Sequence, residues 1–290
     1  MPWLLWRKGK MLMAAYTLIT GATGGIGLEF AKVFAERGSS LILVARNRGR
    51  LKKIQGALES AYRVDVEIIS ADLAEDQAPE NIYRFVKSQG WRVQILVNNV
   101  GFGDHNCFFD TGWQRHKNMI QVNITALMHL THLFGEDMRK NRKGKILNVS
   151  SLASFCAGPY MSVYYASKSF VRSFSEALSE ELKPYHVTVT ALCPGPVATG
   201  FEKNAGLQDS RMFKLLHVSD AASVARAGYV GMMKGKPLVY YGWQTKAASL
   251  LSRMFPRMVT RKAAMYVNVI KESRKVPDTM LKKEKTEECI

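Results

Sequence analysis

One stretch decides the fold of this chain: Tyr16-Thr-Leu-Ile-Thr20-Gly21-Ala-Thr-Gly-Gly25-Ile-Gly27. Its first five residues favour a β-strand, and apolar residues at helical spacing follow its last glycine. Gly21 permits a tight turn, Gly25 lets backbone N–H groups approach a pyrophosphate, and Gly27 allows close packing of helix on strand. Strand, glycine turn and helix together predict a dinucleotide-binding unit. The alternative interpretation is a flexible glycine loop.

The remainder of the chain alternates strand-like runs with helical stretches. This alternation predicts an α/β fold with a single doubly wound, Rossmann-type domain, a mostly parallel seven-stranded sheet and helices on both faces. The site is then expected at the carboxyl edge of the strands. We assign residues 1–243 to a dinucleotide-binding and catalytic domain and residues 244–290 to a basic helical extension and tail. The expected strands are centred on Leu18, Leu41, Val66, Ile95, Ile146, Val187 and Leu238.

The end of the second expected strand, residues 40–45, indicates the cofactor. An enzyme that prefers NAD has an acidic residue here for the ribose 2′-hydroxyl, whereas this chain has Ala45 followed by Arg46. An arginine suits a 2′-phosphate, so we expect NADP(H). The alternative is that Arg46 and Arg48 are solvated loop charges.

A second motif, Tyr164-Tyr-Ala-Ser-Lys168, carries acid–base chemistry. On a helix, Tyr164 and Lys168 lie on one face, and a nearby ammonium favours the phenolate, so we expect the tyrosine pKa to be lowered. Tyr165 has no lysine four residues later. A proton relay beside a nicotinamide site predicts hydride transfer at a carbonyl or an alcohol.

These residues together resemble the short-chain dehydrogenase/reductase family. The resemblance covers Tyr16 to Thr199, and the rest of the domain runs to about Trp243. Within the family, the chain is similar to the branch of 17β-hydroxysteroid dehydrogenases and very-long-chain 3-oxoacyl reductases. Val100 stands where the family commonly has alanine. Six landmarks fall in family order: Gly21/Gly25/Gly27, Asp72, Asn98-Asn99-Val-Gly101, Asn123, Ser151 and Tyr164-x-x-x-Lys168.

The resemblance implies a catalytic role for four residues. Tyr164 is the acid in reduction and the base in oxidation, and Lys168 lowers its pKa and contacts the nicotinamide ribose. Ser151, thirteen residues before Tyr164, orients the substrate oxygen, a spacing that selects it over Ser150. Asn123 holds a water that links Lys168 to solvent, or alternatively caps or bends its helix.

The resemblance also implies the cofactor contacts. Asp72 and Leu73 contact the adenine, and Thr199 contacts the nicotinamide carboxamide or, alternatively, caps the next helix. The remaining expected contacts, besides the glycines, Arg46, Tyr164 and Lys168, are Thr23, Ile26, Asn99, Gly101, Pro194, Gly195 and Val197.

Three variable stretches build the substrate pocket in this family, and here they are residues 102–109, 152–163 and 200–218. They contribute an apolar set: Phe102, Phe108, Phe109, Leu152, Phe155, Met161, Phe201, Leu207, Met212, Phe213 and Leu216. An apolar ketone and its alcohol therefore fit best, either a steroid or a long acyl chain, with hydroxysteroid dehydrogenase activity preferred. The alternative is a 3-oxoacyl thioester reductase. The phosphates of its CoA or carrier protein would then be bound by Lys203, Arg211 and Lys214. A redox sensor that binds NADP(H) without turnover is the alternative of another class.

Composition limits the remaining choices. The net charge is +17, yet no nucleic-acid-binding motif is present, so an acidic ligand or a membrane surface is the expected partner. The four cysteines have no metal-binding spacing, and we expect no metal site. Cys156 either touches the substrate or packs as a small residue. The family resemblance implies a homodimer or homotetramer, paired through the helices that carry Asn123 and Tyr164.

The C-terminal stretch from Ala247 to Ile270 has apolar residues at near-helical spacing and arginines four apart. It predicts a basic amphipathic helix pair interrupted at Pro256. We interpret the pair as a peripheral membrane contact or a lid over an apolar substrate; the alternative is packing on the body or on another subunit. The first ten residues do not have the order of a signal peptide, so a cytoplasmic location is expected.

Overall fold

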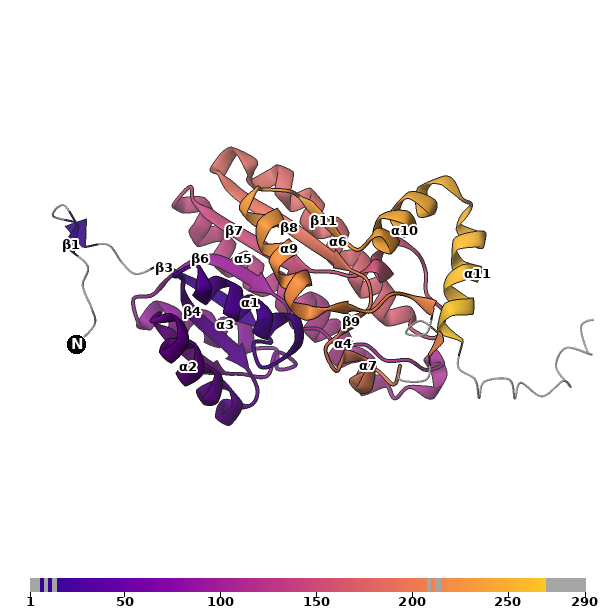
Figure 1. The fold of residues 1–290 in the computed structure, drawn as a ribbon, viewed down its shortest axis with the longest axis horizontal. Coiled ribbons are helices and arrows are strands. Elements are labelled where there is room, and N and C mark those ends of the chain that lie inside the picture. The colour runs from indigo at the N-terminus through magenta and orange to yellow at the C-terminus, as the bar shows by residue number, and fades with distance from the viewer. Residues whose placement is uncertain (1–5, 8–9, 12–14, 208–209, 212–214, 270–290) are drawn as a thin grey trace, which may run out of the picture.

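A computed structural model describes residues 6–7, 10–11, 15–207, 210–211 and 215–269. Its centre is a seven-stranded sheet in the order β11-β8-β7-β6-β3-β4-β5, with every neighbouring pair parallel (Figure 1). All seven predicted strands are confirmed. They are β3 (Ala15–Thr20), β4 (Ser40–Ala45), β5 (Val66–Ser70), β6 (Arg92–Asn98), β7 (Gly144–Val149), β8 (Val187–Pro194) and β11 (Leu238–Tyr241).

Helices cover both faces of the sheet, so its strands are buried on both sides. Along β4, Leu41 and Leu43 pack in one core, while Ile42 and Val44 pack in the other, as the two-residue period of a strand requires. The first face carries α1 (Gly25–Glu36), α2 (Arg48–Tyr62) and α9 (Ala221–Met233), and the second carries α3 (Ala78–Ser88), α5 (Leu127–Lys140) and α6 (Ser162–Leu182).

Strand order reverses between β3 and β6, because the chain adds β4 and β5 on one side of β3 and β6 onward on the other. In open α/β sheets, ligands bind at the carboxyl end of the strands at such a reversal. The shorter elements are β1 (Trp6–Arg7), β2 (Lys10–Met11), η1 (Phe108–Asp110), α4 (Trp113–Ile120), η2 (Gln121–Ala126), η3 (Leu152–Phe155), η4 (Lys183–Tyr185), β9 (Val197–Ala198), α7 (Phe201–Asn204) and β10 (Ser219–Asp220).

The predicted C-terminal helix pair is present as α10 (Trp243–Met254) and α11 (Arg257–Asn268). Pro256 separates the helices, as expected, because proline lacks the N–H that would continue α10. The first helix begins four residues earlier than predicted, directly after Gly242, whose φ of 85° lets the chain turn sharply out of β11. Both helices lie at the opposite end of the molecule from β1 (Figure 1). Among the described helices, none is long and apolar enough to cross a bilayer.

Candidate active site

The glycine turn joins β3 to α1 at the point of strand reversal. Gly21 and Gly25 have φ of 70° and 54°, in the left-handed region that favours glycine. A side chain on Gly25 would come within 2.8 Å of Thr199 Cβ, and one on Gly27 would collide with the carbonyl oxygen of Gly21. The turn therefore depends on glycine both for its backbone conformation and for the close approach of α1 to β3.

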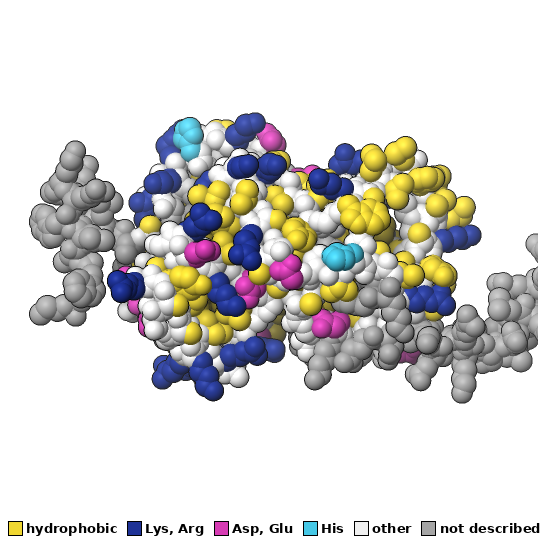
Figure 2. All heavy atoms as spheres, in the orientation of Figure 1, with side chains coloured by type: hydrophobic (Ala, Val, Ile, Leu, Met, Phe, Trp, Pro, Cys, Tyr) yellow, Lys and Arg dark blue, Asp and Glu magenta, His cyan; other side chains and the backbone are white. Residues whose placement is uncertain are grey.

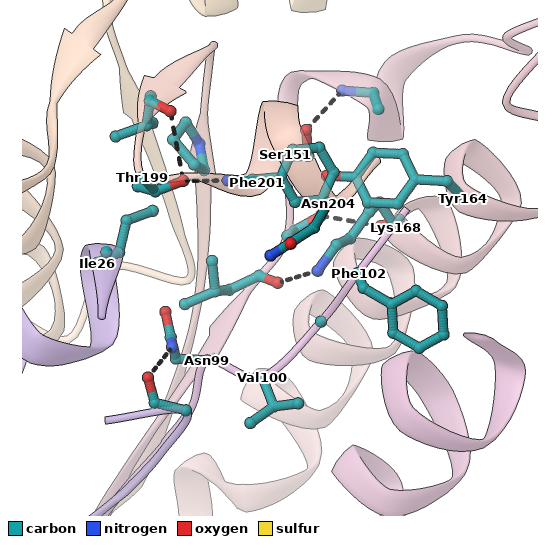
Figure 3. A pocket seen from close by; sticks show the side chains of 18 of the residues that line it. Ile26, Asn99, Val100, Phe102, Ser151, Tyr164, Lys168, Thr199, Phe201 and Asn204 are labelled. Atoms are coloured by element: carbon teal, nitrogen blue, oxygen red, sulfur yellow. Dashed lines mark hydrogen bonds between the residues drawn. The ribbon is translucent and has the colours of Figure 1, made fainter. Parts of the chain in front are cut away.

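One cavity of about 1210 Å³ lies along the carboxyl edge of the sheet. It is larger than the roughly 300–1,000 Å³ of a typical single-ligand site, so it has room for a cofactor and a second molecule. All but two of the predicted site residues line it: Gly21, Thr23, Gly25, Ile26, Arg46, Asp72, Leu73, Asn99, Gly101, Ser151, Tyr164, Lys168, Pro194, Gly195, Val197 and Thr199. Figure 3 shows how Tyr164 and Lys168 face Ser151, Thr199 and Asn99 across this space.

Tyr164 and Lys168 lie one turn apart on α6 and are both buried. The ammonium nitrogen of Lys168 lies 5.8 Å from the centre of the Tyr164 ring and donates a hydrogen bond of 2.9 Å to the carbonyl oxygen of Val149. Gly101 faces this nitrogen, since a side chain there would come within 3.0 Å of it. The absence of a side chain on Gly101 thus leaves space for the lysine.

Burial controls the ionisation of this pair. It raises the pKa of Tyr164 to about 12, although hydrogen bonding with Ser151 pulls that pKa down in part. It also lowers the pKa of Lys168 to about 8. The expected lowering of the Tyr164 pKa is therefore wrong for the protein alone, because desolvation of the phenolate outweighs the hydrogen bond with Ser151.

Asn123 and Gly27 are the two predicted residues outside the cavity wall. Asn123 is fully buried within η2, a π-helical turn between α4 and α5. Its side chain bonds both backbone groups of Phe102, at 3.0 and 2.9 Å, and donates to the hydroxyl of Ser167 at 3.0 Å. The amide thus fixes the loop after β6 against α6 and stands directly beside the lysine.

Two neighbouring amides at the end of β6 join this strand to both of its neighbours. Asn98 donates to Asn148 Oδ1 at 2.9 Å, which joins β6 to β7. Asn99 donates to the carbonyl oxygen of Thr20 at 3.0 Å, which joins β6 to β3 beside the glycine turn. These bonds fix the end of β6, where Asn99 lines the cavity, between β7 and β3.

The end of β4 carries a basic cluster that the sequence analysis identified only in part. Arg46 is exposed and lies 3.8 Å from a carboxylate oxygen of Asp72. Arg50, which was missed, lines the same cavity, and its guanidinium approaches Gly24 in the glycine turn. Arg48 does not line the cavity. The signal for Arg50 was its place three residues after Asn47, which caps α2, because this spacing puts Arg50 in the first turn of the helix beside the end of β4.

The other half of the cavity is apolar. Seven of the expected pocket residues line it: Phe102, Leu152, Phe155, Met161, Phe201, Leu207 and Leu216. The expectation for Phe108 and Phe109 was wrong: Phe108 stacks on His116 at 4.6 Å, and Phe109 is 94% exposed. The loop after β6 turns both rings outward. Met212, Phe213 and Lys214 lie outside the described residues, as does the side chain of Lys203.

Further residues complete this half. Cys156, Tyr165 and Arg115 line the cavity, and the charge of Arg115 is paired with Asp104. The helix pair supplies the remaining wall through Ala248, Leu251, Ser252, Thr260, Ala263, Ala264 and Val267. The expectation that these helices cover the pocket thus agrees with their position, and so does the alternative that they pack on the body.

The residues present fit a dinucleotide. α1 begins at Gly25 without a side-chain cap and without an acidic residue in its first turn. A helix N-terminus of this kind attracts a phosphate group, and the small residues around it leave space for one. The basic cluster at Arg46 and Arg50 lines the same cavity as the start of α1 and as Tyr164 and Lys168.

Comparisons with known proteins agree with this geometry. Residues 15–211 match the family model described as short chain dehydrogenase. The chain is 34% identical over 197 residues to a very-long-chain 3-oxoacyl-CoA reductase of Anas platyrhynchos and 36% identical over 193 residues to human 17-beta-hydroxysteroid dehydrogenase type 3. Each match covers 66% of this chain and 62% of the relative, so the chain spans less than two thirds of either protein.

Among solved structures, a short-chain dehydrogenase from Sphingobium yanoikuyae in complex with NADPH superposes with a TM-score of 0.75 at 28% identity. The superposition covers 83% of this chain and 93% of that one. The family match spans most of the chain, and its landmarks lie together around one cavity. The chain therefore belongs to the short-chain dehydrogenase/reductase family of oxidoreductases.

Proposed function

We propose that this protein is an NADP(H)-dependent oxidoreductase that interconverts an apolar ketone and its alcohol. The single observation that carries the proposal is one continuous cavity with a basic, glycine-lined half and an apolar half, which meet at Tyr164 and Lys168. The two relatives named above act, by their names, on very-long-chain 3-oxoacyl-CoA and on 17β-hydroxysteroids, and the acyl chain of the first and the ring system of the second are both large and apolar.

NADP(H), when bound, supplies or accepts the hydride. Gly25 and its neighbours at the start of α1 would hold the pyrophosphate, and Arg46 and Arg50 would hold the 2′-phosphate. The raised pKa of Tyr164 keeps its hydroxyl protonated at neutral pH, which suits donation of a proton to a carbonyl oxygen. Ser151 would orient that oxygen, and Lys168, beside Asn123, would return a proton to the tyrosine.

A hydroxysteroid is the preferred substrate class. Rigid, bulky side chains such as Phe102, Phe155 and Phe201 line the apolar half. Arg115, which lines this half of the cavity, is paired with Asp104 and is thus not free for a carboxylate or a phosphate. A 3-oxoacyl thioester is the second candidate, because the helix pair leaves a long apolar wall that an acyl chain could follow.

We extend the proposal to a homodimer. The helical stretch that bears Asn123, from α4 through η2 to α5, carries Ile120 and Met128, which are 40% and 41% exposed and do not line the cavity. Burial of such residues between two copies would stabilise a two-fold pair. Sedimentation equilibrium of the purified chain tests this, and a monomer at micromolar concentration would contradict it.

The experiment that tests the activity is NADPH consumption with a panel of ketosteroids and long-chain 3-oxoacyl thioesters, with NADH in parallel. Tyr164→Phe is the blank, because it removes the proton donor while retaining the ring. Tyr165→Phe is the matched control, since that hydroxyl bonds Asn268 and not the reacting groups. We expect turnover of the steroid set, loss of turnover in Tyr164→Phe with NADPH affinity unchanged, and residual turnover in Tyr165→Phe.

Full activity of Tyr164→Phe would refute the catalytic assignment. Tight NADPH binding without turnover of either set would favour the third candidate, a redox sensor. A buried tyrosine and lysine beside the cofactor site argue against a sensor, because burying an ionisable lysine costs stability that nucleotide binding alone does not require.

A further inference from the structure

The helix pair is built with its large apolar side chains turned outward. On α10, the side buried against the body carries Thr245 and Ser249. The opposite side carries Trp243, Leu250 and Met254, which are 74%, 59% and 68% exposed. A helix on the surface of a protein in water normally has the reverse arrangement, with its large apolar residues against the core.

The second helix repeats this arrangement. On α11, the residues buried against the body are Ala264 and Asn268. Met258 and Met265 point away from it and are 56% and 43% exposed, and Tyr266 is 59% exposed with the guanidinium of Arg211 over its ring at 4.7 Å. We call the exposed residues of both helices the outer face: Trp243, Leu250, Leu251, Met254, Phe255, Met258, Val259, Met265 and Tyr266. An apolar patch of this extent indicates a binding surface.

Charge around the outer face has one sign. Between residues 243 and 269 the chain has no aspartate or glutamate, whereas all of its cationic residues there are exposed. These are Lys246, Arg253, Arg257, Arg261 and Lys262. Figure 2 shows the hydrophobic side chains gathered over α10 and α11 with basic side chains among them.

We propose that the outer face binds an anionic lipid surface, with α10 and α11 lying in the plane of the interface. Apolar side chains between cations are the combination that holds a helix at the boundary of acyl chains and acidic headgroups. A second copy of this chain fits less well, because a two-fold contact would place the same cations against each other, and these have no acidic partner among the residues that the structure describes.

The same surface reaches the cavity. Leu251 lines the cavity and is also 46% exposed on the outer face, and Thr260 and Ala263 continue the cavity wall on α11. This consequence rests on the proposed function: an apolar ketone dissolved in the bilayer would enter between the two helices without crossing water.

Co-sedimentation with lipid vesicles tests the proposal. Vesicles of phosphatidylcholine alone are compared with vesicles that also contain phosphatidylglycerol, at low and at high salt. The variants are Met258→Ser with Met265→Ser, and Arg257→Glu with Arg261→Glu. Lys140→Glu with Lys143→Glu is the matched control, since it reverses two exposed charges on another part of the surface. NADPH affinity, measured on each protein, reports an intact fold without requiring turnover.

We expect binding to the anionic vesicles that weakens with salt, falls by more than about ten-fold in both outer-face variants and is retained in the control. Absence of vesicle binding, or equal loss in the control, would overturn the proposal. Self-association that only the methionine variant abolishes would also overturn the proposal, because the outer face would then bind a second copy of the chain. None of these results depends on the substrate, so failure here is distinguishable from failure of the proposed activity.

Discussion

The side chain of Asn268, at the end of α11, accepts a hydrogen bond of 3.2 Å from the hydroxyl of Tyr165, the neighbour of the proposed acid on α6. Asn268 also donates to the carbonyl oxygen of Pro159 at 3.0 Å, and its own carbonyl oxygen contacts His105. One fully buried amide therefore connects the last described helix to the loops around the cavity.

Asn268→Ala should release α11. The change leaves the buried hydroxyl of Tyr165 and the carbonyl of Pro159 without this partner, at a cost of about 1–3 kcal/mol for each group. We expect faster hydrogen exchange of the amides of residues 257–268, because local opening follows the loss of an anchor. Lys262→Ala, which removes an exposed side chain of the same helix, is the control, and equal exchange in both variants would show that Asn268 is no anchor.

Lys168 should make stability depend on pH. Burial lowers its pKa from 10.5 to about 8 in the folded protein, so the unfolded chain binds more protons between these values. The contribution of Lys168 to the free energy of unfolding therefore increases from pH 8 to 10.5, by about 3 kcal/mol at most. Urea unfolding of the wild type and of Lys168→Met at several pH values isolates the contribution of Lys168. The contributions of all other titratable groups cancel when the two free energies of unfolding are subtracted. A difference that stays constant over this range would contradict the burial argument.

Arg46→Ala and Arg50→Ala should each weaken NADPH binding by roughly ten-fold, since a charge-assisted contact to a phosphate is lost. NADH lacks the 2′-phosphate, so its affinity should not change. Arg48→Ala provides the comparison, because this arginine begins the same helix without lining the cavity. Calorimetric titration measures all three, and an equal loss for NADH would mean that the arginines act on the fold rather than on the phosphate.

Gly27→Ala should destabilise the protein by about 1–3 kcal/mol and weaken NADPH binding, because its methyl group would meet the carbonyl of Gly21. Gly56→Ala within α2 has nothing within 4 Å and should instead stabilise the helix by about 0.5–1 kcal/mol. Denaturant unfolding of the two variants compares them directly. If both were equally stable, the close approach of α1 to β3 would not constrain residue 27.

Much of the fold followed from local patterns. The strands were predictable because each of them, like the one that contains Leu41, is a short apolar run. The glycine turn after the first strand identified the first βαβ unit and the helix N-terminus expected to bind a phosphate. The pairing of Tyr164 with Lys168 was equally local, since four residues make one turn of a helix. The break at Pro256 followed from the chemistry of a single residue.

The sequence by itself thus determined the order of the elements and the family, because these depend on short-range spacing within each motif. Tertiary structure alone decided that Phe109 faces solvent, that Arg50 reaches the glycine turn and that Asn268 meets Tyr165. It also decided the direction of the Tyr164 pKa, since that depends on how much protein excludes water from the phenol. Burial and long-range contacts arise from the packing of distant segments, which no local pattern specifies.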